Sequence, residues 1–561
     1  MMETTAASKT AWGSYEGSVG EWTAKAVRQS LVKRIWDKDA SVWKKEAAVH
    51  KEIKNRLGWL NVIAPMKEAA AGFTAFAGEV RAAGFAHVVL LGMGGSSLAP
   101  EVMRSVLGRA EGYPELLVLD STDPGRVADV EKAIDLAKTF FVVSSKSGGT
   151  IELVSLFKYF HAKVREAKGD KAGEQFIAIT DPGTPLENEA RQHGFRRVFL
   201  SPEDVGGRFS ALTPFGLVPA ALIGADLKRL LESAEAMAEQ CASQGPENPA
   251  LALGLGMAVL AEEGRDKLTI LGSKALEAFG DWAEQLVAES TGKEGAGIVP
   301  VVREPLGKAS VYGADRFFVS LSLEGAPDEA LEKRLGELEA AGHPSLSLRL
   351  RDAYDLGGEF FRWEFATAIA CALLKVNAFD QPDVQAAKDR TKGLLKIIES
   401  GKELEVRQSA ASMEAFWENA EEGDYAAILA FLPDRPAVRK KLAALQADVR
   451  NRTKLAVTLG FGPRYLHSTG QLHKGGPNRG IFLLVTAADA PDLAIPGEKY
   501  TFGQLEFAQA TGDFEALETN GRWLYHARLK DVTEKELSFL ADQVGKAVLS
   551  GKEHEKELGN Y

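Results

Sequence analysis

Cysteine is nearly absent from this chain, with two residues among 561. Cys241 and Cys371 lie far apart, without the CxxC spacing of a metal or redox site. The sequence therefore offers no disulfide framework. We expect two buried or neutral thiols in a reducing compartment.

Long hydrophobic runs are also missing. No stretch of about 18 or more apolar residues occurs, so we expect no membrane-spanning segment. Residues 1–10 lack the basic and then apolar pattern of a secretory signal peptide. These absences make the cytoplasm the expected location.

Positive charge is not in excess either, because the formal net charge is -11. Nucleic-acid-binding proteins usually carry a clustered basic face, so we expect no nucleic-acid partner. The nine histidines show neither HExxH nor another paired-ligand spacing. The histidines therefore indicate no metal site.

The pattern that is present is an alternation of short apolar runs with helical stretches. Such alternation is typical of βαβ units with a parallel sheet, and continuous apolarity indicates strands buried on both faces. The runs lie at 86–91, 116–119, 139–144, 176–180 and 197–200, and then at 267–271, 297–302, 317–323 and 345–350.

This rhythm predicts an α/β fold with several units, as the length of 561 residues also suggests. We expect a helical N-terminal segment at 1–75, two doubly wound, mainly parallel α/β domains at 76–240 and 241–404, and a C-terminal α/β extension at 405–561. Within the extension we expect helices at 410–418, 436–459 and 534–549 and a strand at 481–486.

Two glycine-rich loops follow predicted strands of the first domain. The sequence GMGGSS occupies 92–97, and SSKSGGT occupies 144–150. Backbone amides and hydroxyls at a helix N-terminus can bind a phosphate dianion. Because ligands of open α/β sheets bind at the carboxyl ends of strands, the two loops are predicted to hold one small phosphorylated ligand.

A dinucleotide site is an alternative for the first loop. Gly92 and Gly94 fit the first two glycines of that fingerprint, and Asp120 closes the second strand where a ribose-binding acid would lie. However, the third glycine position is occupied by Ser97. A tight turn without any ligand also remains open for this loop.

Several motifs together resemble the phosphoglucose isomerase family, which is built from sugar-isomerase domains. The chain carries GGS at 94–96, the cluster at 145–150, VGGRFS at 205–210, QLVAESTGK at 285–293, FDQPDV at 379–384 and HSTGQLH at 467–473. The set looks most like the isomerase half of bifunctional transaldolase/glucose-6-phosphate isomerase proteins, although no transaldolase barrel is evident.

The resemblance implies an aldose–ketose isomerase that converts glucose 6-phosphate to fructose 6-phosphate through an enediolate. No step of this reaction demands a metal, nucleotide or flavin, so we expect no cofactor. It implies four catalytic residues. Glu289 would move the proton between C2 and C1, Arg208 would offset the enediolate charge, and His467 with Lys388 would open the sugar ring. It also implies a homodimer in which the histidine loop reaches a neighbour's site.

Residue chemistry agrees with these roles. A buried carboxylate suits proton abstraction, because burial destabilises its charged form, and histidine titrates near neutrality. Gln285 lies four residues before Glu289, so both side chains would share one helical face. Lys388 would lie about two turns into a helix that begins near Asp380. Substrate contacts are expected from Gly95, Ser96, Ser145, Lys146, Ser147, Gly148, Gly149, Thr150 and Gln285.

One departure from the family concerns chain order. The usual order places the histidine loop before the lysine segment, whereas His467 follows Lys388 here. His343 has the expected order but lacks the surrounding loop, and His473 belongs to the same motif as His467. His467 is preferred, and the other two remain alternatives.

Three other functions are consistent with parts of the pattern. A non-catalytic sugar-phosphate sensor would keep the 145–150 loop but would not need Glu289, Arg208 and Lys388 together. A nicotinamide-dependent dehydrogenase is disfavoured by Ser97 and by the second phosphate loop. An isomerase could also accept mannose 6-phosphate, which differs at C2 alone.

Overall fold

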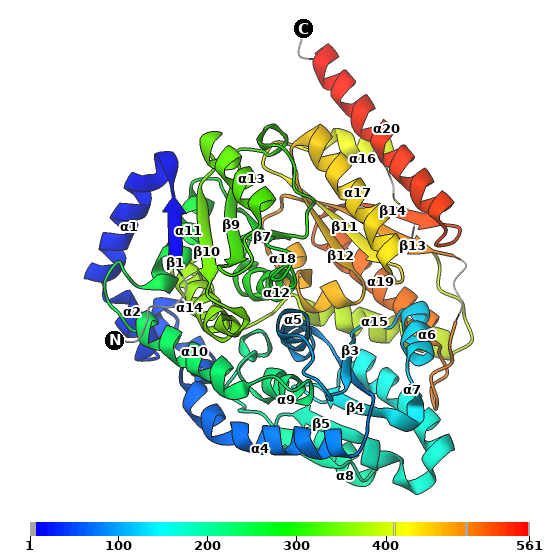
Figure 1. Ribbon diagram of the computed structural model, residues 1–561. Coiled ribbons are helices and arrows are strands. Elements are labelled where there is room, and N and C mark those ends of the chain that lie inside the picture. Colours follow the sequence, from blue (N-terminus) through cyan, green and yellow to red (C-terminus); the bar gives the residue numbers. More distant parts are fainter. Residues whose placement is uncertain (1–6, 408, 410, 489–491, 559–561) are drawn as a thin grey trace.

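The computed structural model describes residues 7–407, 409, 411–488 and 492–558. These residues form three β-sheets surrounded by helices, which confirms the predicted α/β class (Figure 1). The strands of each sheet are parallel apart from β1 (Ala7–Ala11). We refer to them as the first, second and third sheets, in chain order of their main strands.

The first sheet has the strand order β3-β2-β4-β5-β6. The strands that follow β2 in the chain are therefore added first on one side of it and then on the other. The position between β2 and β4 is the topological switch point, where doubly wound sheets bind ligands. The strands are β2 (His87–Gly92), β3 (Glu115–Leu119), β4 (Thr139–Ser144), β5 (Phe176–Thr180) and β6 (Arg197–Leu200). The helices from this part of the chain are α4 (Ile63–Ala82), α5 (Leu98–Leu107), α6 (Pro124–Ala133), α7 (Ile151–Lys168), α8 (Pro185–Gln192) and α9 (Pro214–Leu222).

The second sheet has the order β1-β10-β9-β7-β8. Its first strand lies in the segment that we expected to be helical, and it pairs antiparallel with β10 at the sheet edge. This pairing joins segments far apart in the sequence and leaves no local signature, which explains the difference. The other strands are β7 (Lys267–Gly272), β8 (Val299–Val302), β9 (Arg316–Leu323) and β10 (Ser345–Leu350). The associated helices are α1 (Glu16–Arg28), α2 (Leu31–Trp36), α3 (Ala47–Lys54), α10 (Leu227–Cys241), α11 (Pro249–Glu262), α12 (Phe279–Thr291), α13 (Glu329–Ala340) and α14 (Leu356–Leu374).

The third sheet has the order β12-β11-β13-β14 and is built from the C-terminal part of the chain. The sequence predicted β13 alone, because the other strands lack clear flanking signals. The strands are β11 (Tyr425–Phe431), β12 (Ala456–Phe461), β13 (Gly480–Ala487) and β14 (Trp523–Leu529). The helices are α15 (Val384–Glu399), α16 (Met413–Glu418), α17 (Pro436–Thr453), α18 (Gly470–Gly475), α19 (Phe502–Thr519) and α20 (Glu534–Leu558).

The helix predicted at 436–459 is too long. It ends at Thr453, because Lys454 adopts a left-handed conformation (φ +67°) that terminates the helix, and residues 456–461 form β12. The helix predicted at 410–418 begins at Met413, after the N-cap Ser412, while residue 410 lies outside the described residues. The closing helix α20 extends nine residues beyond the predicted end at 549.

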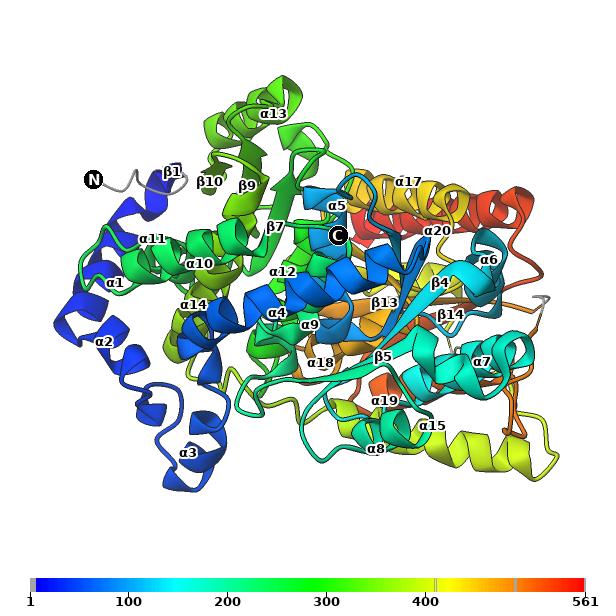
Figure 2. The same ribbon diagram turned by 60° about the horizontal axis from the view of Figure 1, so that its bottom comes forward.

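The second and third sheets are joined by a buried ionic cluster. Glu304, which follows β8, lies 3.0 Å from Arg316 and 3.4 Å from Arg450 of α17, and all three side chains are at most 2% exposed. A buried charge is retained only when it is paired. The third sheet is thus packed into the body of the molecule (Figures 1 and 2).

The described residues confirm the expectation for the two cysteines. Cys241 and Cys371 are buried and unpaired, and burial raises the pKa of each thiol to about 12, so both are neutral. Across 7–407, 409, 411–488 and 492–558, none of the helices is long and apolar enough to cross a membrane.

Candidate active site

Helix α12 carries the predicted base. Glu289 and Gln285 lie on one face, and Gln285 Nε2 donates a hydrogen bond to Glu289 Oε2 at 3.2 Å. Both residues are buried. The same amide nitrogen donates to the carbonyl oxygen of His467 at 2.8 Å. Gln285 thus connects the candidate base to the histidine loop of the third sheet.

Arg208 lies in a 3-10 turn, η7 (Gly207–Phe209), with Nη1 3.5 Å from Glu289 Oε2. Its guanidinium donates to Ser290 Oγ at 2.8 Å, Gln381 Oε1 at 2.8 Å and the Asp380 carbonyl at 2.9 Å. These bonds fix a buried positive charge beside the carboxylate. Most of its donors are thereby committed to the protein, so Arg208 can act on a ligand mainly through its charge.

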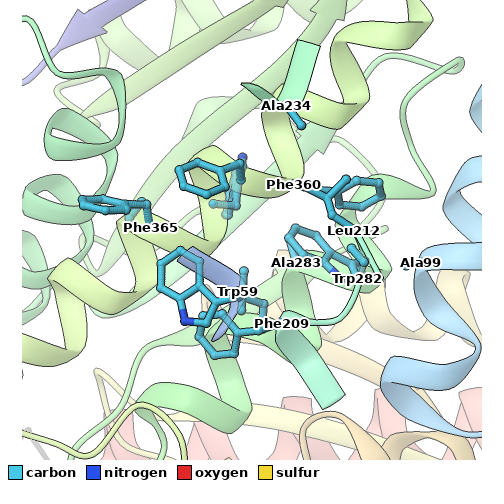
Figure 3. Close-up of a cluster of buried hydrophobic side chains, with 14 of the residues drawn as sticks. Trp59, Ala99, Phe209, Leu212, Ala234, Trp282, Ala283, Phe360 and Phe365 are labelled. Atoms are coloured by element: carbon cyan, nitrogen blue, oxygen red, sulfur yellow. The ribbon is translucent and has the colours of Figure 1, made fainter. Parts of the chain in front are cut away.

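A cluster of buried aromatic side chains packs against this turn. Phe209 stacks on Trp59 (Figure 3), and their ring centroids are 5.3 Å apart. Trp282 of α12 belongs to the same buried cluster and contacts Phe360 edge-on at 4.7 Å. Packing therefore holds Phe209, which follows Arg208, and Trp282, which lies one turn before Gln285, and this limits movement of the two polar side chains.

The first glycine loop allows three segments to meet. A Cβ at Gly94, whose φ is +54°, would lie 2.8 Å from the carbonyl oxygen of His467, and a Cβ at Gly95 would lie 2.0 Å from that of Gly207. Any larger residue would therefore push the 94–96 turn away from the histidine loop and from the Arg208 turn. Ser96 is buried in the same turn.

The second loop joins β4 to α7 on the other side of the switch point. Ser145 Oγ lies 3.2 Å from Thr150 Oγ1 and accepts a hydrogen bond from the Gly148 amide at 3.1 Å, which closes the loop. Ser147, Gly149 and Thr150 line a cavity of about 150 Å³. Lys146 instead forms an ion pair with Asp181.

His467 enters this cavity from the third sheet. It ends a 3-10 turn, η10 (Arg464–His467), that follows β12, and its Nε2 lies 2.8 Å from Oε1 of Glu152 on α7. Gln509 of α19 donates to the same carboxylate oxygen at 2.7 Å. Burial acts to raise the pKa of Glu152, but the attraction of His467 and Lys388 outweighs it and holds that pKa below its usual value.

Lys388 lines the same cavity from α15. It lies about one turn from the start of that helix, not two, because α15 begins at Val384 and not near Asp380. Pro382 disfavours a helical residue before it. In addition, Lys293 and Arg208 both bind the Asp380 carbonyl, at 2.6 and 2.9 Å, and so keep this segment out of a helix.

The two alternative histidines lie elsewhere. His343 is buried against Phe318 and Tyr312, and burial lowers its pKa to about 4. His473 is buried 3.0 Å from the hydroxyl of Tyr425, and burial holds its pKa well below the usual value. Neither lines the cavity with Lys388, so the geometry favours His467.

Four residues of this site were missed by sequence reasoning: Glu152, Gln381, Lys293 and Gln509. Lys293 ends the QLVAESTGK motif, and Glu152 lies two residues after the 144–150 loop, so both had a local signal. Gln509 had none, because its link to Glu152 spans 357 residues. Lys293 is buried and binds Asp380 Oδ1 at 2.8 Å.

Comparison with known proteins gives a consistent picture. A family profile described as phosphoglucose isomerase matches residues 58–300. The chain is 31% identical over 404 residues to a glucose-6-phosphate isomerase of Carboxydothermus hydrogenoformans, covering 62% of this chain and 86% of the relative. It is 30% identical over 363 residues to that of Rubrobacter xylanophilus, covering 55% of this chain and 82% of the relative.

Solved structures agree on the fold. A hypothetical protein of Thermus thermophilus aligns with a TM-score of 0.58 and 24% identity, over 69% of this chain and all of that one. A glucose-6-phosphate isomerase from Chlamydia trachomatis aligns with a TM-score of 0.53 and 22% identity, over 60% of this chain and 74% of that one.

Proposed function

The chain belongs to the phosphoglucose isomerase family and interconverts glucose 6-phosphate and fructose 6-phosphate, and we propose that the residues gathered at this site divide the steps among them. The observation that carries the proposal is the position of Gln285. Its amide touches both the carboxylate of Glu289 and the backbone carbonyl of His467, so it links the segment of the candidate base to the segment of the candidate ring-opening group.

Phosphate binding falls to the loop at 145–150. Its hydroxyls and amides lie at the start of α7, next to the switch point of the first sheet. Ser147, Gly149 and Thr150 face the cavity directly, whereas Lys146, tied to Asp181, acts through the shape of the loop. Gly95 and Ser96 lie in the first glycine loop, packed against the Arg208 turn, and we assign their backbone groups to the substrate as well.

Ring opening falls to His467 and Lys388. The hydrogen bond to Glu152 orients the imidazole, and Lys388 supplies a second proton-carrying group in the same cavity. The imidazolium form can then give a proton to the ring oxygen as the bond between that oxygen and C1 breaks, and the C1 hydroxyl passes its own proton to the neutral imidazole that results. The open-chain sugar that results presents C1 and C2 to the base.

The proton transfer falls to Glu289. It takes the proton from C2 and returns it to C1, and the negative charge of the intermediate lies near the fixed guanidinium of Arg208. A preorganised charge costs no reorganisation at the moment of reaction. Gln285 keeps the carboxylate in place between turnovers.

Finer features are proposals as well. We retain the division at 1–75, 76–240, 241–404 and 405–561, supported by three sheets that fall within the last three ranges, apart from β1. The likeness to the isomerase half of bifunctional transaldolase proteins rests on the motifs alone. The cytoplasmic location and the homodimer remain predictions.

The direct test is an assay of the purified, chelator-treated protein with fructose 6-phosphate and no added cofactor. Formation of glucose 6-phosphate is expected. Binding of fructose 6-phosphate without turnover would instead favour the sugar-phosphate sensor. Running mannose 6-phosphate in parallel shows whether the enzyme also accepts the C2 epimer.

A further inference from the structure

Arg464 connects the three sheets at one point. It is the first residue of η10, after β12 of the third sheet. Its Nε lies 3.2 Å from Oδ2 of Asp120, which follows β3 of the first sheet, and its Nη2 lies 3.6 Å from Oδ2 of Asp281 on α12. The arginine side chain is 21% exposed and each carboxylate 13%, so the cluster is largely removed from water.

Both carboxylates are connected to the active site through contacts within the protein. Asp120 Oδ2 accepts a hydrogen bond from Ser97 Oγ at 3.3 Å, and Ser97 Oγ lies 3.1 Å from the Gly94 carbonyl oxygen. Gly94 in turn is in close contact with the backbone of His467. Asp120, the acid that a dinucleotide site would require, is thus committed to a contact within the protein.

Asp281 is connected to the active site through helix α12. Asp281 lies one turn before Gln285, whose amide holds the carbonyl of His467 at 2.8 Å. Arg303 also binds Asp281, at 2.7 and 3.0 Å, so this carboxylate is anchored to the second sheet independently of Arg464. The 464–467 turn is therefore fixed at its beginning by two ion pairs and at its end by Gln285 and Glu152.

The charges in this cluster depend on one another. Burial raises the pKa of Asp120, and Arg464 opposes that rise. Burial would also raise the pKa of Asp281, but Arg303 and Arg464 outweigh it and hold that pKa below the usual value. Loss of Arg464 would leave Asp120 without its cation, while Asp281 would keep Arg303.

From this geometry, and on the basis of the proposed function, we propose that Arg464 is a positioning residue for ring opening. It locks the histidine turn of the third sheet against both other sheets and so sets the reach of His467 into the cavity. The restraint reaches His467 through the backbone, because both residues belong to the same four-residue turn. Arg464 itself lines a different cavity and acts through His467.

The test compares Arg464→Met, Arg464→Lys and Arg439→Met with the wild type. Arg439 is the matched control, since it lines the same neighbouring cavity but pairs with Asp434 within the third sheet's own segment. Two quantities are measured: kcat for fructose 6-phosphate, and the Ki of an acyclic phosphorylated hydroxamate that mimics the enediolate. The inhibitor needs no ring opening, so it reports on the base side of the site.

We expect Arg464→Met to lower kcat by about 10- to 100-fold, a fraction of a full general acid–base contribution, with the Ki changed by less than about threefold. Arg464→Lys should recover part of the loss, because one ammonium can satisfy one carboxylate, and Arg439→Met should match the wild type. A kcat retained by Arg464→Met, or a Ki weakened in parallel with kcat, would overturn the positioning role. An inactive wild type would overturn the proposed function itself.

Discussion

The Nε2 of His467 lies 2.8 Å from Oε1 of Glu152, although 315 residues separate them in the chain. The histidine comes from the third sheet and the carboxylate from the first turn of α7, beside the phosphate loop. This contact places a proton-carrying group next to the predicted phosphate site. It also makes the C-terminal part of the chain a structural component of the site.

Replacing Glu289 by Gln tests the base. The amide preserves shape but cannot accept the C2 proton, so we expect kcat to fall by about 10²–10⁴-fold with little change in KM. The matched control is Glu284→Gln on the same helix. Burial raises the pKa of Glu284 to about 8, so this side chain is already largely neutral at pH 7, and its variant should keep full activity. Full activity in Glu289→Gln would show that another residue acts as the base.

Replacing Glu152 by Gln tests the partner of His467. The amide keeps an acceptor oxygen but removes the negative charge that faces the imidazole, so we expect kcat to drop by roughly 10- to 100-fold. A stability effect should accompany it. The folded pKa of Glu152 lies below its unfolded value, so its stabilising contribution is present above the unfolded value of 4.5 and is lost as pH falls through the folded pKa.

Denaturant melts of both proteins across this acid range measure that contribution. The difference in unfolding free energy between wild type and Glu152→Gln should shrink as the pH is lowered. A difference that stays constant with pH would mean that the ion pair with His467 does not form in solution.

Mixing two inactive variants tests whether each site is complete within one chain. Glu289→Gln and His467→Asn are co-expressed and purified together. If His467 served a neighbour's site, a mixed dimer would contain one site with both wild-type groups and would recover activity. Because Gln285 and Glu152 hold His467 within its own chain, we expect no recovery in the mixture. Substantial recovery would show exchange of the histidine loop between subunits.

We expect Lys293 to make the unfolding free energy depend on pH in the alkaline range. Burial and, secondarily, Arg208 lower its pKa to about 8, from 10.5 in the unfolded chain. Between these values the unfolded chain binds more protons, so the contribution of Lys293 to the unfolding free energy should rise as pH increases from about 8 to 10.5. The unfolding free energy of the wild type minus that of Lys293→Met, measured by denaturant unfolding, should therefore increase over this pH range. A difference that decreases as the pH rises would contradict the lowered pKa of Lys293.

Much of the first two sheets could be predicted from the sequence. Most of their strands are short apolar runs, and each run that the sequence indicates proved to be a parallel strand; β2, β4, β5 and β7 are almost entirely buried. The third sheet was harder. Its first strand, β11 (Tyr425–Phe431), follows a polar stretch. The sequence predicts a helix through residue 459, because the first residues of β12 (Ala456–Phe461) continue the apolar pattern of α17.

The sequence by itself determined the local parts of this protein: two glycine-rich loops after buried strands, and Gln285 and Glu289 on one face of α12. Local periodicity and turn chemistry encode such features within a few residues. The tertiary structure alone decided which histidine enters the cavity, that Glu152 and Gln509 meet it, and that Asp120 pairs with Arg464. Those contacts join residues from distant parts of the chain, and they arise from the packing of three sheets, which no local pattern records.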